Sequence, residues 1–224
     1  MIIQESLVSM AADGIRKMVI GGELRQGDKL NEPPLAERLG ISRPPLREAL
    51  RTLEAEGILE QTPRRGYRVV VLTDTDIEEI YSLRRSLEDF ALTLIERHRT
   101  PEMFDELDAV MRRMRSAASA GGDRPAVVQA NVDFHVGVVA ASGHRRLVHV
   151  YRTLMVQMQL SMATNVLTEE RSSGDLLKGC ERHERLLSSL RYDDPNAVRK
   201  AFDEHGELDY VGTAAAIDTK GERA

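Results

Sequence analysis

Two arginines, Arg43 and Arg47, stand four residues apart and therefore share one face of any helix that contains them. Leucines of the same segment fall on the opposite face, where they can anchor the helix to its own core: Leu46, Leu50 and Leu53. A guanidinium fork can bond guanine O6 and N7 together, which is worth about 1–3 kcal/mol of base discrimination. The spacing predicts a helix whose exposed face reads base edges in a major groove.

Residues at the start of that helix and at a later turn complete the candidate DNA-contacting set. Ser42 and Pro44 flank Arg43 at the helix N-terminus, which favours a phosphate group. Arg64, Arg65 and Gly66 form an expected hairpin tip, from which the two cations could reach the DNA backbone or a minor groove. The alternative is a solvated charged helix that pairs locally with glutamates, here Glu37, Glu48 and Glu54.

The segments around these residues predict three helices and a hairpin. Pro33 and Pro34 are tolerated in a first helical turn, and Gly40 is a natural helix end. The expected elements, in chain order, are helices over 6–20, 35–39 and 42–57 and strands over 58–61 and 67–71. This order is that of a winged helix-turn-helix.

A second group of residues suits metal binding. Asn131 and His135 lie four apart on one helix face, and Pro195 places His183 and His205 on two further helices. One oxygen and three imidazoles would suit a divalent transition metal with open coordination positions. From spacing alone, surface or hydrogen-bonded core histidines remain the alternative. The other three histidines show no such pattern and are expected to be surface or structural residues: His98, His144 and His149.

The remainder of the chain predicts helices only. Thr73-Asp74-Thr75 is a helix start and marks a domain boundary. Proline and glycine breaks then separate helical stretches at about 75–98, 101–119, 124–141, 145–170, 175–191 and 194–213. The expected fold is mainly α, with a winged helix-turn-helix over 1–72, an all-α helical bundle over 73–216 and a disordered tail over 217–224.

Composition restricts the classes of protein that fit. The chain holds 31 Lys and Arg against 36 Asp and Glu, a net charge of −5, which argues against a uniformly basic nucleic-acid coat. The excess of acidic residues lies beyond residue 72, where the chain has 20 basic and 26 acidic residues. Residues 1–72 have 11 basic and 10 acidic residues. A single cysteine forms no internal disulfide. Without an apolar run near the roughly 20 residues of a membrane span, we expect a cytoplasmic protein with no membrane partner.

The N-terminal motifs resemble the GntR family of bacterial transcription regulators. The likeness runs through GDKLNE at 27–32, then LAERLGISRPPLREALRTLEAEG, then PRRGYRV, and the later helices resemble the FCD ligand domain of the FadR-like branch. This resemblance implies homodimers on short pseudo-palindromic operators of double-stranded DNA, released by a small molecule. The resemblance also implies that Arg43 and Arg47 contact DNA bases. Pro44 stands where Thr is common in the family, and it cannot supply a hydroxyl to a phosphate.

The same resemblance bears on the metal and on the effector. In similar FCD domains an Asp or Asn and three histidines hold a divalent metal, and the matching positions are Asn131, His135, His183 and His205. Zinc is the first expectation, with nickel or manganese as alternatives, and the neutral amide of Asn should weaken the site. Arg84 matches an Arg-x-x-x-Glu position that could bind the carboxylate of a small organic acid bidentately. The alternative is a surface Arg84–Glu88 ion pair.

These expectations describe a ligand-responsive repressor or activator and not an enzyme. The C-terminal bundle would dimerise, hold metal and effector, and change the separation of two DNA-reading heads. The competing hypothesis is a metal-dependent hydrolase with a fused DNA-binding head. Against it, no motif comparable to HExxH places a general base beside the histidines.

Overall fold

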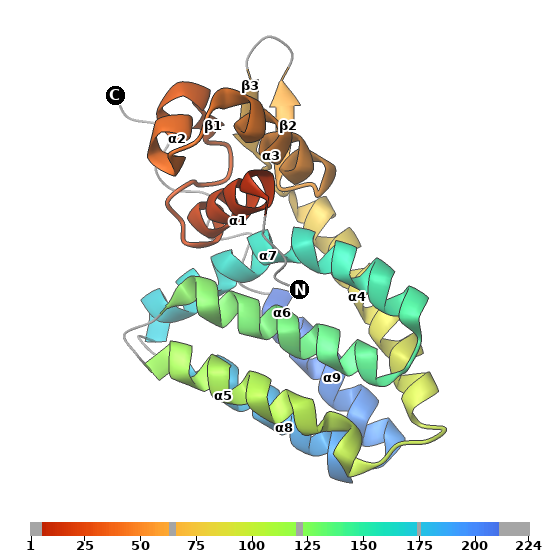
Figure 1. Cartoon of the computed structure of the whole chain (residues 1–224). Coiled ribbons are helices and arrows are strands. Elements are labelled where there is room, and N and C mark those ends of the chain that lie inside the picture. Colours follow the sequence, from red (N-terminus) through yellow and green to blue (C-terminus); the bar gives the residue numbers. More distant parts are fainter. Residues whose placement is uncertain (1–5, 63–65, 120–122, 174–175, 211–224) are drawn as a thin grey trace. The chain divides into compact units, whose positions relative to one another are not determined.

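The computed structural model describes residues 6–62, 66–119, 123–173 and 176–210 (Figure 1). The chain divides into two compact units, 1–72 and 73–224, and each is considered by itself. Of the helices described, none is long and apolar enough to cross a bilayer. The expected tail over 217–224 lies outside the described residues.

The first unit combines three helices with a small antiparallel sheet. The helices are α1 (Leu7–Ile20), α2 (Glu32–Leu39) and α3 (Arg43–Ala55), and the strands are β1 (Lys29–Leu30), β2 (Leu59–Thr62) and β3 (Gly66–Val69). The strand order is β1-β3-β2, with Lys29 opposite Arg68 and Leu30 opposite Tyr67. The winged helix-turn-helix prediction is confirmed, although the two-residue strand β1 is an addition to the expected hairpin.

The turn between α2 and α3 follows from local chemistry. Pro33 and Pro34 occupy the first turn of α2, so that helix begins at Glu32 and not at the expected residue 35. Gly40 ends α2 in the left-handed conformation, with φ of 65°. Ser42 is the N-cap of α3, but its side chain makes no capping hydrogen bond. The inner face of α3 is fully buried through Leu46, Ala49, Leu50 and Leu53.

The described part of the second unit is helical throughout, as predicted. Thr73 and Asp76 form a capping box at the start of the first helix. The elements are α4 (Asp74–Ile95), a short 3₁₀ turn (Pro101–Phe104), α5 (Asp105–Ser119), α6 (Arg124–Ala141), α7 (Arg145–Ser173), α8 (Leu177–Tyr192) and α9 (Pro195–Tyr210). Helix α6 packs against α5 and α7, and α8 packs against α5 and α9.

Phe134 marks the centre of this bundle. Its side chain is fully buried in a core that includes Phe104 and Met114. Its ring also meets the imidazole of His183 edge to face, at 5.0 Å between centroids. It also meets the ring of His135, the next residue in the chain, at 5.4 Å between centroids. The core therefore extends directly to two of the histidine rings discussed next.

Candidate DNA-reading face and buried histidine cluster

The outer face of α3 carries the arginines expected to read DNA. Ser42, Arg43, Pro44 and Arg47 are all exposed, opposite the buried leucine face of the same helix. Arg47 Nε donates to Glu32 Oε2 at 2.9 Å, with 59% of the arginine side chain exposed. An exposed pair of this kind is worth about 0–1 kcal/mol and can exchange for a DNA contact. The arginine is therefore paired locally yet remains accessible.

The expected hairpin tip is described only in part. Gly66 begins β3 with φ of 80°, a conformation that glycine adopts without strain. Arg64 and Arg65 lie outside the described residues. Their DNA contacts stay a prediction.

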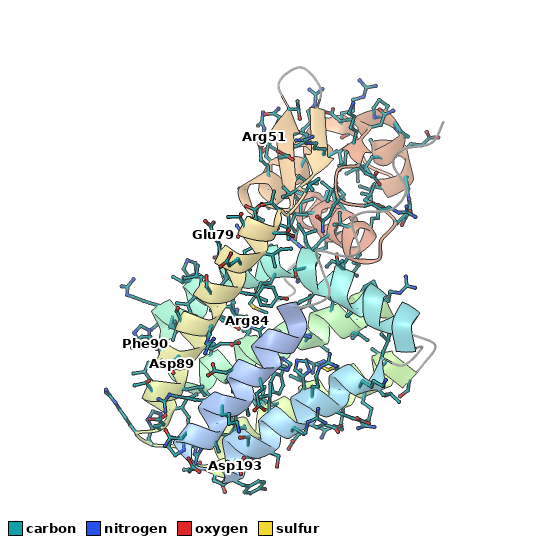
Figure 2. The ribbon with its side chains drawn as sticks, turned by 180° about the vertical axis from the view of Figure 1, so that it is seen from behind. Arg51, Glu79, Arg84, Asp89, Phe90 and Asp193 are labelled. Atoms are coloured by element: carbon teal, nitrogen blue, oxygen red, sulfur yellow. The ribbon has the colours of Figure 1, made fainter. Side chains whose placement is uncertain are left out.

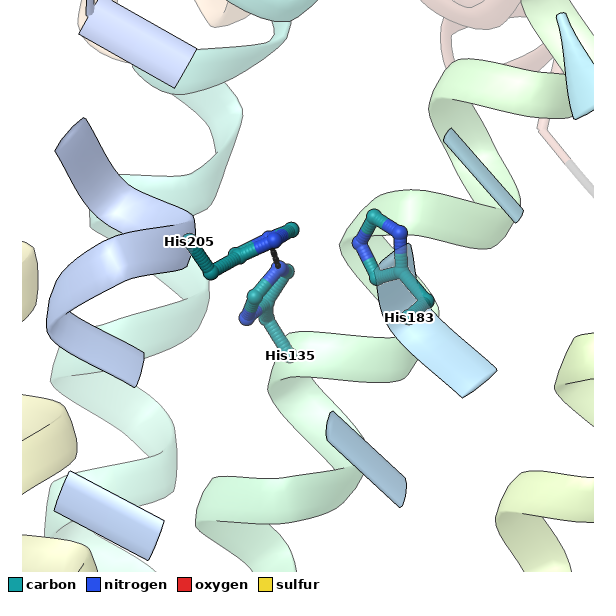
Figure 3. A group of neighbouring side chains, drawn as sticks. All are labelled: His135, His183 and His205. Carbon is teal, nitrogen blue, oxygen red and sulfur yellow. Dashed lines mark hydrogen bonds between the residues drawn. The ribbon is translucent and has the colours of Figure 1, made fainter. Parts of the chain in front are cut away.

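Three of the four expected metal ligands meet inside the second unit. His135 on α6, His183 on α8 and His205 on α9 turn their rings toward one another (Figure 3). Each is at most 4% exposed, and candidate ligand atoms from the three lie within 4.8 Å of one another. His98, His144 and His149 are exposed, in agreement with the sequence interpretation.

The ring nitrogens of the cluster are oriented as metal ligands require. His183 Nδ1 donates to the carbonyl of Gly179 at 2.7 Å, which leaves Nε2 as a buried acceptor without a hydrogen-bond partner. The Nε2 atoms of His135 and His205 lie 3.3 Å apart. Two nitrogens bound to one tetrahedral zinc are about 3.3–3.4 Å apart, because each Zn–N bond is about 2.0–2.1 Å. The cluster thus fits a divalent transition metal.

Asn131 supplies a further observation in favour of this fit. Its Oδ1 atom is buried and has no hydrogen-bond partner, and the residue lines a small cavity together with His183. A buried oxygen in this condition is costly unless a ligand satisfies it. Asp133, in contrast, accepts from Arg113 at 3.0 Å and from Gln129 at 2.9 Å. Of these two neighbouring residues on α6, Asn131 is therefore the better candidate ligand.

A buried polar network holds His135 from the α4 side. Glu88 Oε1 lies 2.9 Å from His135 Nδ1 and also accepts from Arg84 Nε at 3.1 Å and from the Tyr151 hydroxyl at 2.6 Å. Arg84 Nη2 lies 2.9 Å from His135 Nε2, so metal binding at that nitrogen requires this contact to be released. Figure 2 locates Arg84 on α4. Such a carboxylate–histidine contact fixes the tautomer of a ligating imidazole.

The structure corrects one of the two interpretations of Arg84, that of a surface ion pair. The Arg84–Glu88 pair exists, but Arg84 is only 2% exposed, so it is not a surface pair. The carboxylate that Arg84 binds in the structure belongs to the protein. Its binding of an effector carboxylate stays a prediction. The contacts of Glu88 with His135 and with Tyr151 were not expected, because the sequence shows Glu88 only as part of the Arg-x-x-x-Glu pattern.

Burial and neighbouring charges set the protonation of this network. Burial alone would raise the pKa of Glu88, but the charge of Arg84 and the contacts with His135 and Tyr151 outweigh it and lower that pKa to about 2. Burial, reinforced by the adjacent imidazoles, holds the pKa of His183 and that of His205 well below their ordinary value of 6.5. Both imidazoles are therefore neutral near pH 7, the form that binds metal.

These lowered pKa values predict a pH dependence of stability. His183 and His205 take up protons near pH 6.5 when unfolded but only at lower pH when folded, so the unfolded state gains protons first. The melting temperature of the chelator-treated protein should therefore fall as pH drops below about 6.5. A double variant, His183→Gln with His205→Gln, should show a shallower decline. Equal declines in the two proteins would contradict the assigned protonation.

Two family models match the chain, one for each unit. Residues 7–69 match the family described as bacterial regulatory proteins, gntR family, and residues 79–208 match the FCD domain. The chain belongs to the GntR family of regulators and carries an FCD domain in its second unit.

Individual relatives agree with this assignment. The chain is 27% identical to the uncharacterized HTH-type transcriptional regulator YdhC of Bacillus subtilis, over 83% of this chain and 81% of that protein. It is 29% identical to a probable D-xylose utilization operon transcriptional repressor of Paenarthrobacter nicotinovorans, over 89% and 85%. The solved structure of E. coli McbR/YncC shares the fold, with a TM-score of 0.71, 24% identity, and coverage of 92% and 96%.

Proposed function

We propose that this GntR-family regulator binds an operator as a homodimer and responds to a small carboxylate held beside a metal ion in the FCD domain. The DNA half of the proposal rests on α3, which exposes Arg43 and Arg47 opposite a fully buried leucine face. Operators with two-fold symmetry suit a dimer because each copy reads one half-site. We expect the protein to act in the cytoplasm, where such DNA is accessible.

The metal half of the proposal rests chiefly on His183. Its Nε2 is buried and without a hydrogen-bond partner, and it faces the imidazoles of His135 and His205. Asn131 would supply a neutral oxygen as a fourth ligand. Zinc is the proposed metal because three imidazoles and one oxygen suit it, with nickel or manganese as alternatives. The bound ion would supply a positive charge that attracts the effector carboxylate.

The same network offers a route from the ligand site toward the DNA-binding unit. Arg84 and Glu88 lie on α4, and α4 begins at Asp74, directly after the first unit ends at Leu72. A ligand that binds one arrangement of α4 more tightly than another would change the population of each. The effector would thus alter operator affinity through the helix that carries the contacts to His135.

The hydrolase hypothesis finds no support. Glu88, the acidic residue in contact with the cluster, is bound to Arg84, His135 and Tyr151 and is not placed to activate a water molecule. Relatives matched along most of the chain are named as transcriptional regulators. A turnover assay on esters and amides with the zinc-loaded protein is expected to show no hydrolysis above background.

Replacing Arg47 by alanine tests the DNA-reading role. The variant should lose about 1–3 kcal/mol of binding to its preferred sequence and should discriminate less between bases at one position of each half-site. Fluorescence anisotropy against a panel of single-base operator variants measures both effects. Arg85→Ala, which removes an exposed arginine of the second unit, is the matched control and should bind normally. An equal loss on every sequence would show that Arg47 contacts a phosphate instead.

A further inference from the structure

Arg84 brings a positive charge into direct contact with the histidine cluster. Its Nη2 atom lies 2.9 Å from His135 Nε2 and 3.1 Å from His135 Nδ1. His135 Nε2 in turn lies 3.3 Å from the Nε2 atom of His205. The guanidinium therefore lies against the same ring nitrogen that a metal ion in the cluster would bind.

The charge of this guanidinium opposes the binding of a metal ion. An arginine stays protonated in proteins, so Arg84 cannot lose its charge when the ion arrives. Arg84 and the three imidazoles are buried, so water screens the repulsion only weakly. Coulomb energies add, and the removal of one nearby positive charge therefore favours a divalent cation whatever other charges surround the site.

The influence of Arg84 also reaches the other two imidazoles. Burial is the main reason why the pKa of His183 and that of His205 lie well below 6.5, and the charge of Arg84 contributes to the lowering of both. Arg84 thus acts against a proton at these rings. A divalent ion held by the same rings carries more positive charge than a proton and meets a repulsion of the same origin.

Glu88 has the opposite charge and the opposite expected effect. Its Oε1 atom accepts from Arg84 Nε at 3.1 Å and lies 2.9 Å from His135 Nδ1. A carboxylate bound to the far nitrogen of a ligating imidazole strengthens that ligand, and its loss typically costs about 10–100-fold in metal affinity. The two members of one buried ion pair should therefore change metal affinity in opposite directions, which a shared structural role would not do.

We propose that Arg84 lowers the affinity of the histidine cluster for its metal ion, so that the ion is released more readily than the same imidazoles would release it without this guanidinium. The inference rests on the proposed function, since it describes the regulation of the same site. Metal binding would move the Arg84 side chain away from His135 Nε2. Because Arg84 lies on α4, which begins directly after the first unit in the chain, metal occupancy would change the contacts of that helix.

Zinc titration of the full-length protein against a competing chelator of known affinity tests the inference. The Arg84→Met variant should bind zinc about tenfold more tightly than the unmutated protein, or tighter still. Glu88→Gln should bind zinc about tenfold more weakly, or weaker still. Arg85→Met is the matched control, because it removes the next arginine of α4, which is exposed and paired with Asp203. The control should bind zinc as the unmutated protein does.

A double variant keeps the test valid if Arg84→Met folds poorly. Arg84→Met combined with Glu88→Gln removes both charges, and replacing a whole buried ion pair is tolerated better than removing one partner. The double variant should bind zinc about tenfold more tightly than Glu88→Gln alone. Melting curves recorded in chelator establish that each protein is folded before it is titrated.

The possible failures separate this inference from the proposed function. If the double variant binds zinc no more tightly than Glu88→Gln, Arg84 does not oppose the metal and the inference is overturned, while the metal site stands. Equal tightening in Arg85→Met would show a general effect of net charge and would also overturn it. If none of the proteins binds zinc, the proposed metal site itself fails.

Discussion

The Glu88→Ala variant is expected to lose about 3–5 kcal/mol of unfolding free energy. Glu88 is 6% exposed and is the shared partner of Arg84, His135 and Tyr151. Its removal takes a counter-charge away from the buried guanidinium of Arg84, and breaking a buried ion pair in this way costs about 3–5 kcal/mol. The loss should be largest near neutral pH, because the pKa of Glu88 lies at about 2 and the carboxylate is fully charged there.

Chemical denaturation of the metal-free protein measures this effect without interference from the metal. Asp89→Ala is the matched control, since it removes the neighbouring carboxylate, which is exposed and paired with Arg199, and should cost about 1 kcal/mol or less. The Glu88→Gln variant keeps the shape of the side chain and one hydrogen-bond acceptor. Its loss of unfolding free energy should lie between those of Glu88→Ala and Asp89→Ala. A Glu88→Ala protein as stable as the Asp89→Ala protein would show that the network contributes little.

The second large effect is expected from removing two histidines of the cluster. The His135→Ala, His183→Ala double variant should bind no zinc and should gain no thermal stability when zinc is added. For the unmutated protein, free zinc at 1,000 times its dissociation constant should stabilise the folded state by about 4 kcal/mol. The two proteins should differ because the imidazoles of His135 and His183 are buried candidate metal ligands at the centre of the site.

Elemental analysis of protein prepared without chelator provides the direct readout, with melting curves alongside. His144→Ala with His149→Ala is the control, because both residues are exposed and lie outside the cluster. That protein should keep its metal. Absence of bound metal from the unmutated protein would contradict the site, and so would equal zinc content in the cluster variant.

Most of the fold could be predicted from sequence because its signals are local. The helix ends follow from caps and breakers, such as the capping box at Thr73 and the left-handed Gly40. Strand β1 could not be predicted in this way. It has two residues, too few for an alternating pattern, and it exists only because Lys29 and Leu30 meet β3 across a long stretch of chain.

In the site, too, contacts between residues close in sequence could be predicted, whereas contacts between separate helices could not. Spacing alone could not show that His135, His183 and His205 converge, since they lie on three separate helices, and the family resemblance supplied that expectation. The Arg84–Glu88 pair was visible as a four-residue spacing, but its burial depends on how α4 packs against α6 and α7. The Tyr151 hydroxyl bond to Glu88 spans 63 residues and has no local signal at all.

Selection of bound duplexes from a random DNA pool, with and without zinc and a mixture of small organic acids, tests the central claim most directly. The claim is that α3 reads an operator while the metal-binding bundle controls its affinity. We predict enrichment of one short sequence with two-fold symmetry, loss of that enrichment in Arg47→Ala, and a changed yield when zinc and the organic acids are both present. Recovery of unrelated sequences, identical under every condition, would contradict the account.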